Sequence, residues 1–579
     1  DQELPLESKD FDYVILGTGL TESLVSAALS RIGKTVLHLD ENTFYGASSG
    51  SLTLDSLNDF LTDIEQKSKT EKDTLVPFEW QESTPINKLG PKDVRSVAHV
   101  DVPARPEGTE DMTKDSHASR RCSIDLNPKL IWSRSLVIDT LIRAGSARHL
   151  EFKTVQHLYI QSKEFTQTSV SSASSSNDSA SLSTPALVRV PVSKADVFKS
   201  TDISLIEKRQ LMKFITTISS PDEDEKALLK TFADKPFSEY CKHKKIGQNL
   251  AQFLMYAIAF ESHVPTSPLA LTTQQGVDGI LHFMGSLGRY GGNSPWIYPL
   301  FGMGDLSQSF CRLSAVYGGT FILGQRVSEI NVQLPAPGSG EKPLITSVHV
   351  GVTKDLKCKH LITNVDHVPE LIMPLDYSSS SSAAKSLSRC VLITDKPLKT
   401  AEKTKEILLT VIPPGMYQNS NAVYMFQLDE SASVVPADRY LIHIWTEGSS
   451  SASASSIGGV KTAKEDLEAV VKAFTTPSNA DPIEAFSAQT PNILYVAYFS
   501  HVQRQLRSDV AMPSNLTVIN DLDFELGADC FFRQAQRLFE QLCPNEEFIP
   551  NVPNPEDIIW TGDDAEGAEG TEGVDGTEM

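Results

Sequence analysis

The stretch DYVILGTGLTESLVSAALSRIGKTVLHLD, residues 12–40, decides the fold. Its opening apolar run leads into Gly17 and Gly19, which is typical of a buried parallel strand followed by a tight turn. Apolar residues then recur at helical spacing over residues 20–32, and a second apolar run ends at Asp40. Strand, glycine turn, helix, strand and acid predict the opening βαβ unit of a dinucleotide-binding domain.

The glycine turn departs from the dinucleotide-binding pattern at its third position. In GxGxxG the third glycine lets the helix pack closely on its strand, but Glu22 stands there. A carboxylate at a helix start suits the helix dipole when no ligand is bound. Beside a pyrophosphate, like charges about 4 Å apart would cost on the order of 4 kcal/mol. The turn of Gly17, Gly19 and Glu22 is therefore predicted to be vestigial, and no cofactor is expected.

Composition excludes several classes of function. The 579 residues are 40% hydrophobic and 22% charged, which is enough apolar surface for a folded protein of two domains with insertions. Acidic residues outnumber basic ones, 74 to 52, so the formal net charge of −22 argues against nucleic-acid binding and favours basic partner surfaces. Seven scattered cysteines without a CxxC pair predict reduced thiols in a cytosolic protein and no metal site.

Changes in pattern along the chain predict an α/β domain interrupted by a helical one. Between residues 203 and 290, apolar residues recur at three- and four-residue steps, whereas alternating strands return between 320 and 499. The predicted parts are a first α/β portion at 11–200, with a polar insertion at about 51–121 and a serine-rich loop at about 166–184, a helical domain at 203–290, the rest of the α/β domain at 291–560, and a disordered acidic tail at 561–579.

Several longer stretches carry specific patterns. They are LGTGLTES (16–23), VLHLDENTFYGASSGSL (36–52), DLNPKLIWSRSLVIDTLIRAGSARHLEFK (125–153), EKRQLMKFI (207–215) and RYGGNSPWIYPLFGMGDLSQSFCRLSAVYGGTFIL (289–323). Together they resemble the superfamily of Rab GDP-dissociation inhibitors and Rab escort proteins. That family has a flavoprotein-like fold that needs no flavin, and it carries the same glutamate at the third glycine place. The resemblance implies this fold, with an inserted all-helical subdomain.

Three features are similar to the escort branch of the superfamily. They are the insertion after Tyr45, the strand SRCVLITDKPLK (388–399) and the stretch CPNEEFIPNVPNPEDII (543–559). An escort protein binds newly made, GDP-bound Rab GTPases and presents them to the geranylgeranyltransferase α/β heterodimer. It then carries the lipidated Rab to a membrane. The resemblance thus implies a non-catalytic accessory subunit, in keeping with the absence of an HExxH motif.

The resemblance also implies which residues contact Rab. The positions that match the family's Rab-binding platform are Tyr45, Asp305, Gln308, Arg312, Thr320, Phe321 and Ile322. Asp305 replaces a glutamate and keeps its charge, while Phe321 and Ile322 stand where the family often has tyrosine and methionine. Aromatic anchors, a forked arginine and few lysines suit a protein interface. The alternative is that Tyr45 and Phe321 are core aromatics and that Asp305 and Arg312 form a surface ion pair.

Phe283 matches an escort-type phenylalanine that contacts the transferase α subunit. It also belongs to an apolar helical stripe, so a core role is a comparable alternative. In the family, the helical region from about 205 to 287 opens a groove for the geranylgeranyl chains. Two other functions stay open: a Rab GDP-dissociation inhibitor that recycles prenylated Rab, and a flavin-dependent oxidoreductase, against which Glu22 argues.

Overall fold

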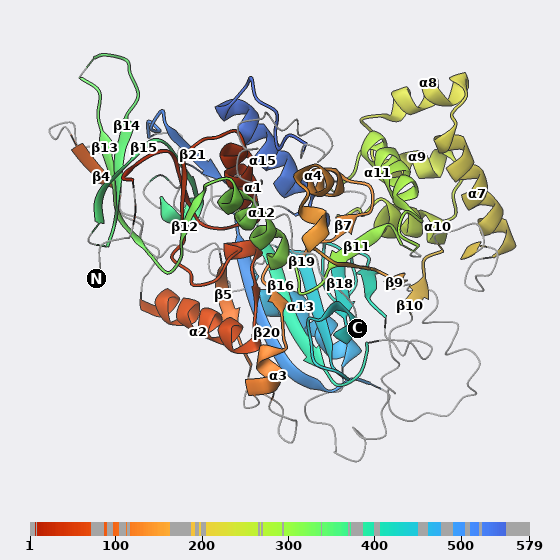
Figure 1. The fold of residues 1–579 in the computed structure, drawn as a ribbon. Helices are drawn as coiled ribbons and strands as arrows, with labels where there is room; N and C mark the ends of the chain where they lie inside the picture. The colour runs from red at the N-terminus through yellow and green to blue at the C-terminus, as the bar shows by residue number, and fades with distance from the viewer. Residues whose placement is uncertain are drawn as a thin grey trace, which may run out of the picture.

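The computed structural model of the chain confirms the predicted βαβ unit and the α/β fold class (Figure 1). β1 (Asp10–Leu16) and β2 (Val36–Leu39) pair in parallel on either side of α1 (Leu20–Arg31) in the sequence. Gly17 has φ 93°, a conformation that glycine adopts without steric cost, so the turn forms as its sequence predicts.

The structure describes residues 6–551 with gaps. The residues outside the description are 7, 71–85, 90–96, 104–111, 113–115, 162–186, 192–195, 198–203, 264–266, 268–269, 292–293, 337, 352, 369–370, 372–385, 399–405, 450–460, 476–489, 504–505, 507–509 and 520–523, and those beyond 551. The predicted serine-rich loop at 166–184 and the predicted acidic tail at 561–579 both lie outside the described residues.

The first sheet contains the glycine-turn unit. Its strand order is β12-β2-β1-β15-β14-β13-β4, and β21 also pairs with β15. The strands added here are β12 (Thr320–Ile322), β15 (Thr353–Asn364), β14 (Leu344–Val350), β13 (Val327–Gln333), β4 (Ile86–Leu89) and β21 (Leu516–Ile519). The strands from β12 to β15, and β21, run parallel, whereas β14, β13 and β4 extend the sheet with antiparallel pairs. β12 lies at an edge.

The second sheet has the order β10-β9-β17-β18-β19-β16-β20-β5 and is mostly antiparallel. Its strands are β10 (Leu187–Arg189), β9 (His157–Gln161), β17 (Leu408–Ile412), β18 (Val423–Leu428), β19 (Tyr440–Glu447), β16 (Ser386–Thr394), β20 (Ile493–Val502) and β5 (Val97–Asp101). The strand patterns predicted between residues 320 and 499 form strands of these two sheets.

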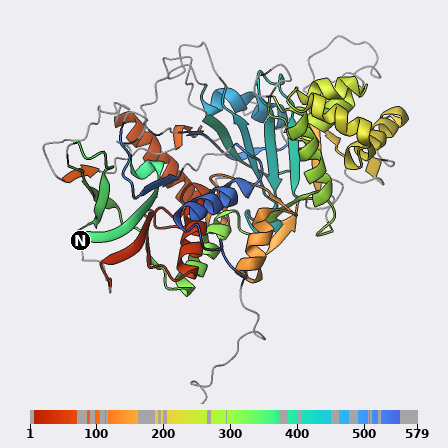
Figure 2. The ribbon, with the colours of Figure 1, turned by 90° about the horizontal axis from the view of Figure 1, so that it is seen from above.

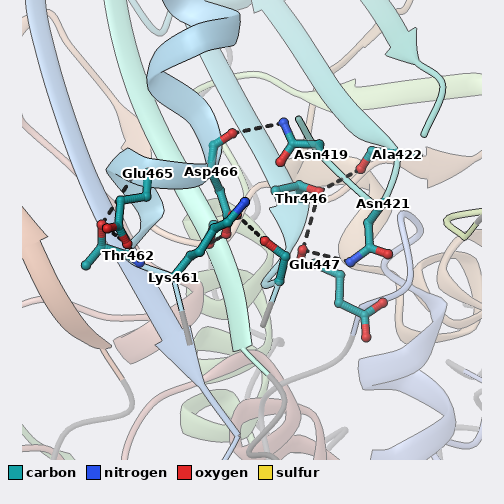
Figure 3. Close-up of polar contacts among 11 residues, drawn as sticks. Asn419, Asn421, Ala422, Thr446, Glu447, Lys461, Thr462, Glu465 and Asp466 are labelled. Carbon is teal, nitrogen blue, oxygen red and sulfur yellow. Dashed lines mark hydrogen bonds and ion pairs between the residues drawn. The ribbon is translucent and has the colours of Figure 1, made fainter. Parts of the chain in front are cut away.

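Helix α13 (Ala463–Phe474) covers one face of the second sheet and is anchored by a buried carboxylate (Figure 3). Asp466 accepts hydrogen bonds from Ser449 Oγ at 2.5 Å and Ser388 Oγ at 2.7 Å, and Asn419 Nδ2 donates to its backbone oxygen at 2.9 Å. Thr462 and Glu465 cap the helix start in a capping box. The buried charge is thus fully engaged by hydrogen-bond donors, as burial requires.

Helix α1 is buried between α12 (Gly304–Val316) and α15 (Asp529–Leu542). The contact with α12 is made by small polar side chains. Ser314 Oγ lies 2.9 Å from Ser26 Oγ and 2.8 Å from Ser30 Oγ, and Ser23 Oγ lies 3.1 Å from Cys311 Sγ. Because these side chains are short, the two helices approach closely, and α12 is held beside the glycine-turn helix.

The described residues between 205 and 286 form the helical region, which lies at one end of the molecule (Figures 1 and 2). It contains α7 (Leu205–Ser219), α8 (Glu223–Phe232), α9 (Phe237–His243), α10 (Gln248–Gln252), the π-helical turn η3 (Phe253–Ile258) and α11 (Thr273–Ser286). The second sheet lies between this region and the first sheet (Figure 2). The inserted all-helical subdomain of the predicted fold class is therefore present.

The predicted polar insertion at about 51–121 differs from the structure in its described parts. Helix α2 (Leu54–Thr70) buries Leu54, Leu57 and Leu61 completely in the main core. β4 and β5, also within this stretch, are the edge strands of the two sheets. The stretch is polar on average, but the apolar residues of α2 fall on one face of the helix, so this part belongs to the core.

The remaining described elements are short and connect these layers. They are η1 (Ala47–Ser49), β3 (Ser51–Leu52), α3 (Ser116–Arg120), β6 (Ile124–Asp125), β7 (Ile131–Trp132), α4 (Leu136–Ala144), η2 (Ser146–His149), β8 (Phe152–Thr154), β11 (Trp296–Pro299), η4 (Val365–His367) and η6 (Glu430–Ala432).

Candidate functional site

Helix α12 presents one exposed polar face. Asp305, Gln308 and Arg312 follow each other at steps of three and four residues, which places them on the same side of the helix. Gln308 and Arg312 are exposed, and Asp305 is half-buried, so burial raises the pKa of its carboxyl group. Because the opposite side of α12 packs on α1, this face is free to meet another molecule.

Tyr45 and Phe321 form the aromatic border of this face. Tyr45 lies in the loop after β2, and Phe321 lies on the edge strand β12. Their ring centroids are 6.4 Å apart in an edge-on arrangement, and Phe321 also packs against His38 at 4.8 Å. Both aromatic residues are half-buried, so each ring rests on the protein and keeps part of its surface accessible.

The loop of Tyr45, helix α12 and strand β12 border a cleft of about 550 Å³. It is lined by Tyr45, His149, Leu150, Asp305, Gln308, Ser309, Cys311, Arg312, Ala315, Gly319 and Phe321. Five of the seven residues predicted to contact Rab are in this set, although more than 250 positions of sequence separate Tyr45 from Asp305. Among the described residues, Asp305 and Arg312 form no ion pair with each other, so they are not the surface pair of the alternative interpretation.

Thr320 and Ile322 are placed differently from the other five. Neighbouring side chains of a strand point to opposite faces, so Thr320 and Ile322 point away from the side on which Phe321 contacts Tyr45. Neither residue lines the cleft, and Ile322 packs against the hydrophobic cluster of the first sheet. These two residues complete strand β12 and do not join the cleft.

Val316 and Leu150 are surface or cleft residues that the sequence prediction missed. Val316 follows Arg312 by one helical turn on the same face of α12, and 72% of its side chain is exposed. The four-residue step from Arg312 to Val316 could have predicted from the sequence that both lie on the same helix face. Leu150 comes from a distant segment after α4, so its place in the cleft depends on the tertiary fold.

The glycine turn supports the Tyr45 loop. Thr18 donates to Asp40 Oδ2 from its backbone nitrogen at 2.8 Å and from its hydroxyl at 2.5 Å. Thr18 Oγ1 in turn accepts the backbone N–H of Gly46 at 3.0 Å. Asp40 is the acid that a dinucleotide-binding domain uses for a ribose hydroxyl. Here its carboxylate binds the chain's own turn, and with it the residue after Tyr45.

Glu22 occupies the space that a pyrophosphate needs. Its side chain is fully buried and folds back over the turn, so that a Cβ on Gly19 would lie 2.5 Å from Glu22 Oε2. His38, also fully buried, is kept neutral because desolvation lowers its pKa to about 4. The turn therefore presents a carboxylate and a neutral imidazole where an anion would bind, and these residues do not fit a dinucleotide.

We expect the purified protein to be colourless and to show no rise in melting temperature when FAD is added. The physical reason is that both the pyrophosphate place and the ribose-binding acid are occupied by the chain itself. The visible absorption spectrum and a thermal shift titration check this. Glu22→Gly is a useful second variant, because Asp40 still binds Thr18 and FAD should still have no effect. Saturable stabilisation of the native chain by FAD would contradict the interpretation.

Phe283, which the resemblance matches to a transferase contact, is buried in the core in this structure. Only 1% of its side chain is accessible. The ring packs edge-on against Trp132 and beside Phe260, each with centroids 6.3 Å away. The apolar stripe of α11 faces the body of the protein, and the structure agrees with the core alternative for this residue.

Three general properties complete the description. No helix in the described part of the chain is long and apolar enough to cross a membrane. Within the same residues, no group of three or more histidine, cysteine, aspartate or glutamate side chains is arranged to hold a metal ion. All seven cysteines are buried and none is in a disulfide.

The chain is similar to known proteins over nearly its whole length. The chain is 28% identical to human Rab proteins geranylgeranyltransferase component A 1, covering 96% of this chain and 94% of that protein. It is 24% identical to Rab escort protein 1 of Arabidopsis thaliana, with 95% and 96% of the two chains covered.

A solved structure supports the fold, and a family model matches most of the chain. A crystal structure of the Rab GDI of Plasmodium falciparum superposes with a TM-score of 0.59 at 18% identity, covering 94% of this chain and 99% of that one, which supports the GDI-like fold. The family model for the GDP dissociation inhibitor matches residues 7–76 and 93–502. With most of its length matched by this model, the chain belongs to the GDP dissociation inhibitor family.

Proposed function

We propose that this chain is a Rab escort protein. It binds newly made, GDP-bound Rab GTPases in the cytosol, presents them to the Rab geranylgeranyltransferase α/β heterodimer and delivers the lipidated Rab to membranes. Its role in prenylation is that of a non-catalytic accessory subunit. The relatives aligned over nearly the whole chain are named as escort proteins or as component A of the transferase, which supports this proposal.

The cleft between Tyr45, α12 and Phe321 is the observation that carries the proposal. It brings together five residues that match the family's Rab-binding platform, and it combines aromatic rings, one carboxylate and one exposed arginine. Such a mixture suits a protein partner, because aromatic and arginine side chains dominate binding energy at interfaces. A Rab partner would have to offer hydrogen-bond acceptors to Arg312 and apolar area to Tyr45 and Val316.

Arg312→Ala is expected to weaken binding of GDP-loaded Rab about tenfold to thirtyfold, or roughly 1.4–2 kcal/mol, without lowering the melting temperature. The guanidinium is exposed on α12 and ion-pairs with no described residue, so the free protein does not depend on it. Titration calorimetry with unprenylated Rab, together with thermal unfolding, measures both quantities.

Two variants serve as controls for Arg312. Arg312→Lys keeps the charge but loses the planar fork, so it should fall between alanine and the native residue. Arg209→Ala removes an exposed arginine on α7, which lies at the right-hand end of the molecule and away from the centrally placed α12 (Figure 1), and should leave Rab affinity unchanged. Normal Rab binding by Arg312→Ala, or a melting temperature several degrees lower, would show that Arg312 is not a binding residue.

A Rab GDP-dissociation inhibitor is the alternative within the family. It would bind prenylated Rab but not the transferase, so co-purification with the transferase heterodimer separates the two functions. The decisive assay is reconstitution of a Rab, the heterodimer and labelled geranylgeranyl diphosphate with and without this chain. We expect label on the Rab only when the chain is added, and we expect none when the heterodimer is left out. We place the binding site for the lipid in the helical region, as the family resemblance implies.

A further inference from the structure

The two halves of the proposed Rab-binding surface come from distant parts of the sequence, and a buried polar cluster joins them. Tyr45 precedes η1 and β3, whereas Asp305 lies in the first turn of α12. The cluster consists of Ser51, Asp125 and Tyr298. Ser51 and Asp125 are opposite each other in the β3–β6 pair, so the loop of Tyr45 is tied to Asp125 by backbone pairing as well.

The cluster caps the start of α12 from outside the helix. Asp125 Oδ1 accepts the backbone N–H of Met303 at 2.9 Å, and Ser51 Oγ accepts that of Gly304 at 2.8 Å. The first N–H groups of a helix have no partner within it, and a carboxylate beside them also favours the helix dipole. Helix α12 has no capping side chain of its own at Met303. Its start is therefore fixed by residues that belong to the other half of the surface.

The cluster is closed internally by two hydroxyl groups. Ser51 Oγ donates to Asp125 Oδ1 at 2.5 Å, and Tyr298 Oη donates to Asp125 Oδ2 at 2.5 Å. Asp125 is fully buried, which raises its pKa to about 6, although these hydrogen bonds and the buried Arg389 act in the opposite direction. The two hydroxyls thus share one carboxylate, but only that of Ser51 also contacts α12.

Backbone close to this cluster leaves no room for side chains. Gly302 has φ 96°, and a Cβ there would lie 2.5 Å from both Asp125 Oδ1 and Ser51 Oγ. A Cβ on Gly304 would lie 2.7 Å from the backbone nitrogen of Ser51. The glycines of the sequence GMG are therefore required for α12 to begin against the Tyr45 loop, which makes the contact specific to this geometry.

We infer that Ser51 is a positioning residue for Rab binding, which holds Asp305 and the rest of the α12 face in register with Tyr45 through Asp125. The inference rests on the proposed function. It adds that the surface is ordered before Rab arrives, so that binding does not have to order two independent segments. Ser51 itself does not line the cleft and needs no contact with Rab.

Ser51→Ala and Tyr298→Phe form a matched pair that tests this role. Each removes one hydroxyl from the same carboxylate, but only Ser51→Ala also releases the N–H of Gly304. We expect Ser51→Ala to weaken Rab affinity about tenfold and Tyr298→Phe to leave it within twofold. In reconstituted prenylation, Ser51→Ala should raise the concentration of the chain needed for half-maximal rate and leave the plateau rate unchanged. Ser51→Cys keeps the shape but accepts hydrogen bonds weakly, and should lie between Ser51→Ala and the native chain.

The Rab affinities and melting temperatures of these variants, compared with those of Arg312→Ala, distinguish the possible outcomes. If the two hydroxyl variants lose Rab affinity equally, in proportion to their loss of melting temperature, Ser51 is only structural and the inference is overturned. If Ser51→Ala binds Rab normally while Arg312→Ala does not, the inference fails but the proposed surface stands. If Arg312→Ala also binds normally, the proposed surface is wrong and the role of Ser51 falls with it. Hydrogen exchange at Gly304 should be faster in folded Ser51→Ala, which verifies that the intended bond was lost.

Discussion

Replacing Phe283 by alanine is expected to lower the free energy of unfolding by about 3–5 kcal/mol, because the ring is removed from a packed core and leaves a cavity. The ring contacts Trp132 and Phe260, and Trp132 packs against Trp296 with centroids 3.5 Å apart and the ring planes tilted by 35°. These aromatic residues join α11 to β7 and β11 of the main body. The helical region should therefore unfold at a lower denaturant concentration in Phe283→Ala than in the native chain.

Leu281→Ala is the control for Phe283→Ala. Leu281 lies on the same helix with 37% of its side chain exposed, so its removal should cost much less than that of Phe283. Affinities for Rab and for the transferase, measured at a temperature where Phe283→Ala is folded, decide between the two interpretations of Phe283. If only transferase affinity falls and stability is unchanged, the ring leaves its buried place on binding and is the anchor that the resemblance implies.

The second large effect is a loss of stability between pH 6.5 and 9 that depends on His263. Its imidazole lies 3.6 Å from Glu261 Oε1 and 3.0 Å from Glu447 Oε2. These carboxylates, Glu261 first, raise its pKa from 6.5 to about 9. A raised pKa stabilises the folded state fully below the unfolded value of 6.5, and this contribution disappears as pH rises through 9. The shift corresponds to about 3 kcal/mol.

Urea denaturation of the native chain and of His263→Gln at pH 6 and at pH 9 measures this contribution. We expect the native chain to be more stable than the variant by about 3 kcal/mol at pH 6, and the difference to shrink toward zero at pH 9. Glu447→Gln should reduce the pH dependence without abolishing it, because Glu261 remains. A difference that is the same at both pH values would show that His263 is not protonated in the folded chain.

The helical region contacts the rest of the protein at two places. His263 lies where it meets the second sheet, and the aromatic cluster of Phe283 lies where it meets β7 and β11. It forms a backbone bridge with Asn421, whose side chain donates to the backbone oxygen of Glu447 at 3.1 Å (Figure 3). One boundary between the two parts is therefore mainly aromatic, and the other is ionic. Raising the pH above 9 should loosen the ionic contact selectively, which hydrogen exchange around Asn421 can detect.

The sequence was most informative where structure depends on neighbouring residues. The unit of β1, α1 and β2 follows from short apolar runs and the glycines between them, and the strands of both sheets follow from alternation. The helical region follows from three- and four-residue periodicity in the same way. These patterns are local, so they were predicted without knowing how the elements meet.

What the sequence could not provide depends on contacts between distant segments. Phe283 shows the same periodicity whether its stripe faces the body or a partner, and only the packed position of α11 decides between them. Ser51 belongs to a stretch that looked polar and inserted, yet it binds the start of α12 more than 250 residues later. Thr320 and Ile322 matched a motif, but strand alternation turns them away from Phe321.

The glycine turn makes cofactor binding and support of the Tyr45 loop mutually exclusive, because the atoms that a dinucleotide would use hold the Tyr45 loop. Asp40 binds Thr18, and Thr18 binds the backbone beside Tyr45. A dinucleotide would therefore have to compete with the chain's own turn for Asp40. Glu22→Gly alone opens the pyrophosphate place but leaves Asp40 engaged, whereas a substitution of Asp40 removes hydrogen bonds that support the Tyr45 loop. The groups that a dinucleotide-binding domain turns toward its ligand thus support the proposed Rab-binding surface in this chain.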